Sequence, residues 1–175
     1  MNILAIVGSR RRGSFNQALL QAARELAPNE LIINSFDIGQ LPLFNQDQET
    51  NLPPIVVAFK QAIKTADAIL LITPEYNYSF SGVLKNALDW GSRPYGDNSF
   101  ADKPAGIMGA SPSLLGTARA QYQLRQTLVF LDMHALNRPE IMVTNAHEKF
   151  DKNLIIFNNF ALSALPIFAS LNCKN

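Results

Sequence analysis

The chain has 175 residues, 47% of them hydrophobic and 17% charged, a composition that suits one domain with a well-buried core. Its 15 basic and 14 acidic residues nearly balance, which excludes the basic excess of a typical nucleic-acid-binding protein. The single cysteine, Cys173, excludes an internal disulfide and fits a reducing compartment. No apolar stretch approaches the ~20 residues that span a bilayer. We therefore expect a cytoplasmic protein with no membrane or nucleic-acid partner.

Short apolar runs alternate with longer amphipathic segments along the chain. Strands are expected at residues 2–7, 31–36, 68–73 and 105–109, and a fifth within 134–143, where Pro139 interrupts it. Helices are expected at 14–26, from Pro54 to 66, and at 82–90, 117–131 and 153–171, with loops at 37–53 and 95–103. Because parallel strands need crossover connections, this alternation predicts one doubly wound α/β domain over residues 1–175. Its five-stranded parallel sheet would carry helices on both faces.

In such sheets, ligands bind beyond the carboxyl ends of the strands, where the strand order reverses. The loop after the first strand, residues 8–16, has the composition of a phosphate site. Ser14 is a good N-cap for the following helix, whose free N–H groups would face a bound anion. The glycines do not form the GxGxxG pattern, and Ser14 stands where a nucleotide triphosphatase has lysine. An alternative reading is that Arg10, Arg11 and Arg12 form a solvated patch.

The loop after the third strand, within residues 71–90, combines flat side chains with hydrogen-bond donors. Pro74 and Tyr76 offer packing surfaces for a flat ring, and Asn77 offers an amide. Glu75, beside them, is expected to have a structural or binding role. Trp90 is expected in the core.

Three segments together resemble a known family: GSRRRGSFN at 8–16, TPEYNYSFSGVLKNALDW at 73–90 and GASPSLLGTARAQYQLRQ at 109–126. They are similar to the NADPH-dependent FMN reductases, a flavodoxin-like group with chromate-, quinone- and azo-reducing members. The resemblance implies FMN as cofactor, with its phosphate held by Ser9, Arg11, Ser14, Asn16 and Gln17. It implies ring contacts from Pro74, Glu75, Tyr76 and Asn77, and a third loop, Ser111 to Gly116, on the other side. Thr117 departs from the family, which often has a further glycine there.

The resemblance also implies a function and an assembly. NADPH or NADH would reduce FMN, which would pass electrons to a small-molecule acceptor such as a quinone, azo compound, chromate or flavin. A homodimer or homotetramer is expected, with Arg119, Tyr122 and Arg125 in subunit contacts; the alternative is a solvated helix face.

Several alternatives stay open. A flavodoxin-like electron carrier or a flavin-binding regulator without turnover would share the fold. Arg10 or Arg12 is a candidate for the extra phosphate of NADPH, and Asp37, after the second strand, for a ribose. Tyr78, Phe80 and Tyr95 are candidates for an acceptor pocket. No metal site is expected, because His134 and His147 belong to no cluster with ligand spacing.

Overall fold

The structure, a computed structural model, describes residues 1–156. Their strands form one parallel sheet in the order β2-β1-β3-β4-β5, with β6 also paired to β4. This is the flavodoxin-like order, as expected. The strands are β1 (Asn2–Val7), β2 (Ile32–Ser35), β3 (Ala68–Ile72), β4 (Pro104–Ala110), β5 (His134–Ala135) and β6 (Ile141–Val143).

The fifth position of the sheet is divided. One strand was expected within 134–143, and the structure has two short strands, β5 and β6, that both run beside β4. Residues 136–140, which include Pro139, separate them. Proline has no N–H to donate to a neighbouring strand, so pairing stops there and resumes at Ile141.

The helices follow the predicted alternation. They are α1 (Phe15–Leu26), α2 (Pro54–Thr65), α3 (Gly82–Ser92), α4 (Ala118–Phe130) and the short α5 (Ala146–Lys149). The expected loop at 37–53 contains two 3₁₀ helices, η1 (Ile38–Gln40) and η2 (Gln46–Gln48). The helix expected at 153–171 lies mostly outside the described residues, as does Cys173. Its first residues, 153–156, form a turn and a bridge from Ile156 to Phe150, so a helical start at 153 was wrong.

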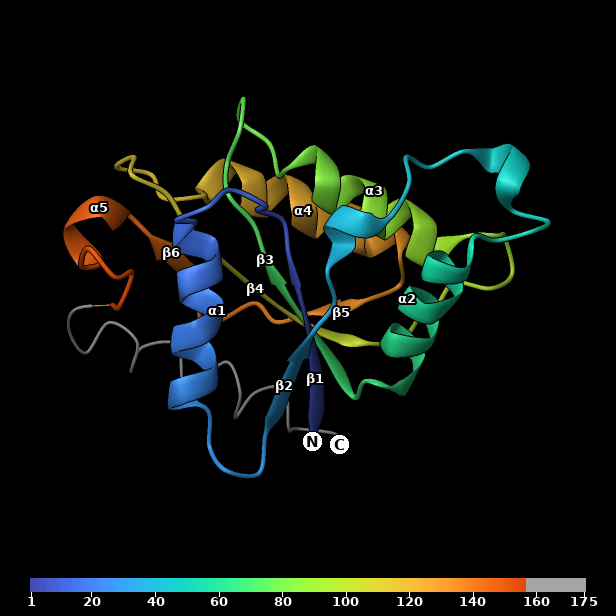
Figure 1. Cartoon of the computed structure of the whole chain (residues 1–175), viewed down its shortest axis with the longest axis horizontal. Helices are drawn as coiled ribbons and strands as arrows, with labels where there is room; N and C mark the ends of the chain where they lie inside the picture. The colour runs from blue at the N-terminus through green and yellow to red at the C-terminus, as the bar shows by residue number, and fades with distance from the viewer. Residues whose placement is uncertain (157–175) are drawn as a thin grey trace.

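Each face of the sheet carries its own core. In β1, Ile3, Ala5 and Val7 pack toward α1 and α5, whereas Leu4 and Ile6 pack toward α2, α3 and α4. Figure 1 shows α1 and α2 on opposite sides of the strands. The alternation explains why β3, and β1 from Ile3 onward, are apolar at every position: successive side chains point to opposite faces, and both faces are covered.

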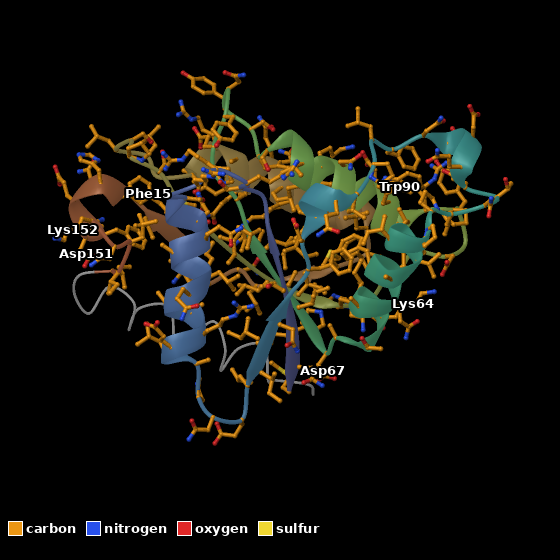
Figure 2. All side chains as sticks on the ribbon, viewed as in Figure 1. Phe15, Lys64, Asp67, Trp90, Asp151 and Lys152 are labelled. Carbon is orange, nitrogen blue, oxygen red and sulfur yellow. The ribbon has the colours of Figure 1, made fainter. Side chains whose placement is uncertain are left out.

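The second core also contains the aromatic residue expected there. Trp90 of α3 is fully buried, lies on the α2 side of the molecule in Figure 2, and donates from its indole Nε1 to the Pro42 carbonyl at 2.8 Å. Phe44 packs edge-on against it, with ring centroids 4.9 Å apart. Trp90 therefore anchors the 37–53 loop over the sheet and does not wall a cofactor site.

The chain leaves β1 toward β2 on one side and returns to β3 on the other. The strand order therefore reverses between β1 and β3, where a crevice is expected. The loops that follow β1, β3 and β4 all lie at the carboxyl edge of the sheet, the upper edge in Figure 1. This edge gathers residues 8–14, 73–81 and 111–117.

Candidate active site

The loop after β1 is built to receive an anion. The Ser14 Oγ accepts hydrogen bonds from the backbone N–H groups of Asn16 (3.2 Å) and Gln17 (3.3 Å), and so caps α1 as expected. Gly13 has φ +68°, which turns the chain into the helix. None of the backbone N–H groups of residues 9–15 donates to another described residue. Such a run of free donors at a helix N-terminus suits a phosphate.

Side chains around the same loop leave further donors available. The Ser14 hydroxyl lies 2.8 Å from the Ser9 hydroxyl, and both side chains are buried. Arg11 donates from Nη2 to the Gly13 carbonyl at 2.9 Å and lies over the Phe15 ring, 5.6 Å from its centroid. The rest of the Arg11 guanidinium faces solvent, where it can approach an anion held by the loop.

The Asn16 side chain lines the cavity between the loops and is also hydrogen-bonded within the fold. This buried side chain donates from Nδ2 to the Ala110 carbonyl at 3.0 Å and accepts from the Ala110 N–H at 2.9 Å. These two residues are 94 positions apart in the chain. The Asn16 amide thus joins the start of α1 to the end of β4, and it holds the first and third loops at a fixed separation.

The loop after β3 is a tight hairpin. Tyr76 and Ser79 exchange both backbone hydrogen bonds at 2.9 Å, and the two residues between them have positive φ, 49° at Asn77 and 67° at Tyr78. Asparagine tolerates this backbone, whereas tyrosine is strained in it by ~1–2 kcal/mol. The hairpin projects from the carboxyl edge in Figure 1 and exposes Tyr76 and Tyr78.

The hairpin is tied to α4 by Glu75 and Arg119. Glu75, whose side chain is 5% exposed, accepts from the Arg119 guanidinium at 2.5 Å and from the Ala120 N–H at 3.2 Å. The same guanidinium lies 3.7 Å from the centre of the Tyr78 ring. Because both oxygens of Glu75 are engaged with α4, the expected structural role of this residue fits its contacts.

The third loop folds on itself. Ser111 donates its N–H to the Val143 carbonyl at 3.0 Å, and Ser113 donates its N–H to the Ser111 hydroxyl at 3.2 Å. Gly116 takes φ +60°, which completes the turn into α4. The side chain of Thr117, where the chain departs from the family pattern, is fully buried and accepts from Gln121 Nε2 at 2.9 Å. The extra side chain therefore fills the interior beneath the loop.

The three loops enclose a cavity of about 300 Å³, a size suited to a small ligand. Eight of the expected binding residues line it: Ser9, Arg11, Ser14, Asn16, Pro74, Glu75, Tyr76 and Ser111. Three do not: Gln17 faces a neighbouring cavity, Asn77 lies at the hairpin tip, and Gly116 lies in the turn before α4. Phe15, Ala110 and Pro112 line it although we did not expect them. The sequence could have indicated these three residues, because each is adjacent in the chain to an expected binding residue or lies in the same loop.

The histidines lie outside this cavity. His134 begins β5, with its Nε2 2.7 Å from an Asp102 oxygen, and His147 lies in α5. Within residues 1–156, no group of three or more His, Cys, Asp or Glu side chains is arranged to hold a metal ion. The helices of this part of the chain are too short or too polar to cross a bilayer.

Comparison with known proteins identifies the family. The sequence-family model of the NADPH-dependent FMN reductases matches residues 1–148 of the chain. The chain belongs to this family. It is 53% identical over 152 residues to an NAD(P)H-dependent FMN reductase of Pseudomonas aeruginosa, with 86% of this chain and 82% of that protein covered. It is 45% identical over 153 residues to a 2-hydroxy-1,4-benzoquinone reductase of Burkholderia, with 87% and 84% covered.

A solved structure gives the same answer. The flavoenzyme NAD(P)H:(acceptor) oxidoreductase FerB from Paracoccus denitrificans superposes with a TM-score of 0.87 at 33% identity, covering 98% of this chain and 93% of that one. This member of the NADPH-dependent FMN reductase family is an FMN-dependent oxidoreductase that takes electrons from NAD(P)H and gives them to a small-molecule acceptor. The donor set of the cavity fits FMN, since free N–H groups suit its phosphate and flat side chains suit its ring.

Proposed function

We propose that this FMN reductase reduces quinones, and that its FMN binds in the cavity between the loops after β1, β3 and β4. The observation that carries the proposal is the two-ended chemistry of this cavity. Unpaired backbone N–H groups and Arg11 come from the loop after β1, and Pro74, Tyr76 and Pro112 come from the loops after β3 and β4. A phosphate monoester joined to a flat ring matches both ends.

In this proposal, the residues around the phosphate divide into two groups. Ser9, Ser14 and Arg11 have hydroxyl or guanidinium donors near the free N–H groups and contact the phosphate directly. Asn16 and Gln17 act by position, because the Asn16 amide is bonded to Ala110 and the Gln17 Nε2 donates to the Ser9 carbonyl at 3.0 Å. The pair keeps the loop in the shape that collects its N–H groups.

At the other part of the cavity, the residues of the site would orient the flavin ring. FMN held here would supply the redox chemistry, hydride acceptance from NAD(P)H and electron transfer to the acceptor. Pro74 and Tyr76 pack against the ring from one loop, while Ser111 and Pro112 approach it from another. Glu75 holds the hairpin through Arg119 and transfers no proton. These residues would hold the ring between the second and third loops, where the donor and the acceptor would bind in turn.

Two observations support quinones as the acceptor. One relative is named a 2-hydroxy-1,4-benzoquinone reductase. Tyr76 (54% exposed) lines the cavity, and Tyr78 (64% exposed) lies in the same hairpin; both offer stacking surfaces to a flat, uncharged ring. We also propose that the enzyme works in the cytoplasm, since it draws on reduced nicotinamide cofactors.

The decisive experiment is anaerobic addition of NADPH to the purified, FMN-loaded protein, followed by stopped-flow mixing with 1,4-benzoquinone. We expect rapid bleaching of the flavin spectrum, reoxidation by the quinone, and parallel double-reciprocal lines from the two substrates. A flavin that neither NADPH nor NADH bleaches would favour the carrier or regulator alternative. A kcat/KM for an azo dye or chromate above that for quinones would reject the proposed acceptor.

We further propose a homodimer or homotetramer that uses the outer face of α4. Of the three residues expected in subunit contacts, Arg119 is engaged with Glu75 and Arg125 donates to the Leu136 carbonyl at 2.8 Å, both within the chain. Tyr122 remains half exposed, and Val129 and Phe130 are 80% and 75% exposed further along the helix. A monomeric mass by light scattering at micromolar concentration would reject this assembly.

A further inference from the structure

A second cavity lies next to the proposed FMN site. It has a volume of about 410 Å³ and opens between the carboxyl ends of β1 and β2. Ser9 lines both cavities, so the loop after β1 separates them. The side chains that matter here are those of Arg10, Gln17, Ser35, Phe36 and Asp37. Any ligand that occupies this cavity lies beside the FMN phosphate.

Arg10 is the basic group of this cavity. Its side chain lies against the backbone of Gly39 so closely that a Cβ at that position would overlap the guanidinium. Among residues 1–156 it has no hydrogen-bond or ion-pair partner. Packing therefore holds the guanidinium in place while its N–H groups stay available, which is the state that recognises a phosphate. Arg12 is also exposed but lines neither cavity.

Asp37 is the acidic group of the same cavity, and it too is held in place. Its Oδ1 accepts from the Gly39 N–H at 3.0 Å, and its Oδ2 accepts from Gln40 Nε2 at 3.0 Å. Each oxygen keeps a second acceptor site for a ligand hydroxyl. An acidic residue at the end of the second strand that holds a ribose, with an arginine nearby that accommodates a 2′-phosphate, is the arrangement by which dinucleotide-binding domains read an adenosine ribose.

We propose that the cavity between β1 and β2 binds the adenosine ribose of the nicotinamide donor, with Arg10 as the residue that binds the 2′-phosphate of NADPH and Asp37 as the residue that favours the free hydroxyl of NADH. This inference rests on the proposed FMN site, because it sets the donor's adenosine end beside the FMN phosphate. Half-buried Phe36 supplies apolar surface to the same cavity.

The opposed charges of Arg10 and Asp37 give this inference a specific consequence. A 2′-phosphate gains a charge-assisted hydrogen bond from Arg10 and is repelled by Asp37. Because these effects oppose each other, we expect the native enzyme to use both NADPH and NADH, with only a modest difference in kcat/KM between them. Removing either group shifts the preference in a predictable direction. Arg10→Ala favours NADH and Asp37→Asn favours NADPH.

The primary test is binding of 2′,5′-ADP and 5′-ADP, which lack the nicotinamide, to FMN-loaded protein by calorimetry. We expect Arg10→Ala to weaken 2′,5′-ADP binding about tenfold and to change 5′-ADP binding by less than about twofold. Gly39→Ala keeps every charge but displaces the Arg10 side chain, and should weaken 2′,5′-ADP in the same sense. Arg12→Ala is the matched control, since it removes an exposed arginine two residues away; at physiological salt it should change neither affinity by more than about twofold.

The outcomes separate the two proposals. Equal losses in the Arg10 and Arg12 variants, or 2′,5′-ADP that binds only when FMN is absent, would overturn the assigned subsite. The ratio of kcat/KM for NADPH to that for NADH provides the second measurement, and it must fall in Arg10→Ala and rise in Asp37→Asn. If the native enzyme oxidises both donors but neither variant changes this ratio, the subsite is rejected and the proposed function stands. Protein that binds 2′,5′-ADP through Arg10 yet oxidises neither donor rejects the proposed function alone.

Discussion

Glu75 and Arg119, 44 residues apart in the chain, form an ion pair at 2.5 Å that fastens the hairpin after β3 to the first turns of α4. The Glu75 side chain is nearly buried, whereas that of Arg119 is about one-third exposed. The Arg119 guanidinium also makes a cation–π contact with the Tyr78 ring. The pair thus holds Tyr78 in a backbone conformation that is unfavourable for tyrosine. The hairpin owes its shape to a contact that neither segment makes alone.

Removing Arg119 should release the hairpin. We expect Arg119→Met to lower the free energy of unfolding by about 1–3 kcal/mol, because the buried Glu75 carboxylate loses its charged partner. FMN binding should weaken as Pro74 and Tyr76 lose their fixed position. Urea unfolding and flavin fluorescence quenching measure the two effects. Lys85→Met is the control, because Lys85 and Asp89 form an exposed pair on α3 that contributes at most ~0.5 kcal/mol.

A double-mutant cycle with Glu75→Gln tests whether the two residues act as a unit. If they do, the double variant is less destabilised than the sum of the single variants by about 0.5–3 kcal/mol. Additive effects would mean that Arg119 acts through Tyr78 and not through Glu75.

The amide bridge of Asn16 should be sensitive to a change of a single atom. Asn16→Asp keeps the acceptor for the Ala110 N–H but sets an oxygen against the Ala110 carbonyl, 3.0 Å from the present Nδ2. We expect a loss of about 1–3 kcal/mol in stability and weaker binding of both FMN and riboflavin, since the first and third loops separate. If Asn16→Asp has the stability and flavin affinity of the native enzyme, the Asn16–Ala110 hydrogen bonds do not hold the site together.

Ser14 should affect phosphate binding as well as stability. Ser14→Ala removes the cap of α1 and should cost ~0.5–2 kcal/mol. Ser81→Ala is a matched control, because Ser81 caps α3 by accepting from the Leu84 N–H at 3.4 Å and does not line the cavity. Both variants should be destabilised, but only Ser14→Ala should lose FMN affinity while keeping riboflavin affinity. Calorimetric titration with the two flavins distinguishes a cap that binds phosphate from a cap that only supports a helix.

Asp97 should make stability depend on pH in the acid range. The hydrogen bond from the Lys64 ammonium, at 2.6 Å, lowers the pKa of Asp97, and the Lys60 ammonium, 3.3 Å away, acts in the same direction against partial burial. The ionised carboxylate is therefore favoured in the fold over the unfolded chain. Its stabilising contribution is present above the unfolded pKa near 3.8 and is lost as the pH falls through the lower folded value.

Replacing Asp97 tests this dependence. Asp97→Asn should flatten the decline of stability below about pH 4, which thermal unfolding at a series of pH values measures. Asp89→Asn, which breaks the exposed pair with Lys85, serves as the control for removing one carboxylate. A decline in Asp97→Asn as steep as that of the native protein would assign the acid sensitivity to other carboxylates.

The alternation of short apolar runs with amphipathic segments was enough to predict the sheet and most helix boundaries. The reason is that a parallel sheet covered on both faces requires strands such as Ala68–Ile72, in which every residue is buried and apolar. The alternation alone predicted a doubly wound sheet, whereas the flavodoxin-like strand order, with its crevice between β1 and β3, was implied by the family resemblance. The division of the last strand was less predictable, because Pro139 signals a break without saying whether pairing resumes.

The loops show where sequence reasoning reached its limit. Residue types in GSRRRGSFN predicted a phosphate loop, since serine caps and glycine turns act locally. The two hydrogen bonds between Asn16 and Ala110 could not be predicted from the sequence, because they join segments 94 residues apart. Likewise, nothing in the run of three arginines distinguished Arg10 from Arg12 until the chain after β2 brought Gly39 and Asp37 beside Arg10.

The sequence by itself determined the fold class, the family and the loops that form the site, because these depend on local patterns and short motifs. Only the tertiary structure decided which side chains of those loops line the cavity and which hold the loops together. That division depends on the partner each polar atom finds across the sheet edge, as Glu75 finds Arg119 and Asn16 finds Ala110. A polar atom with a partner inside the fold supports the site, and one without a partner is available to the substrate.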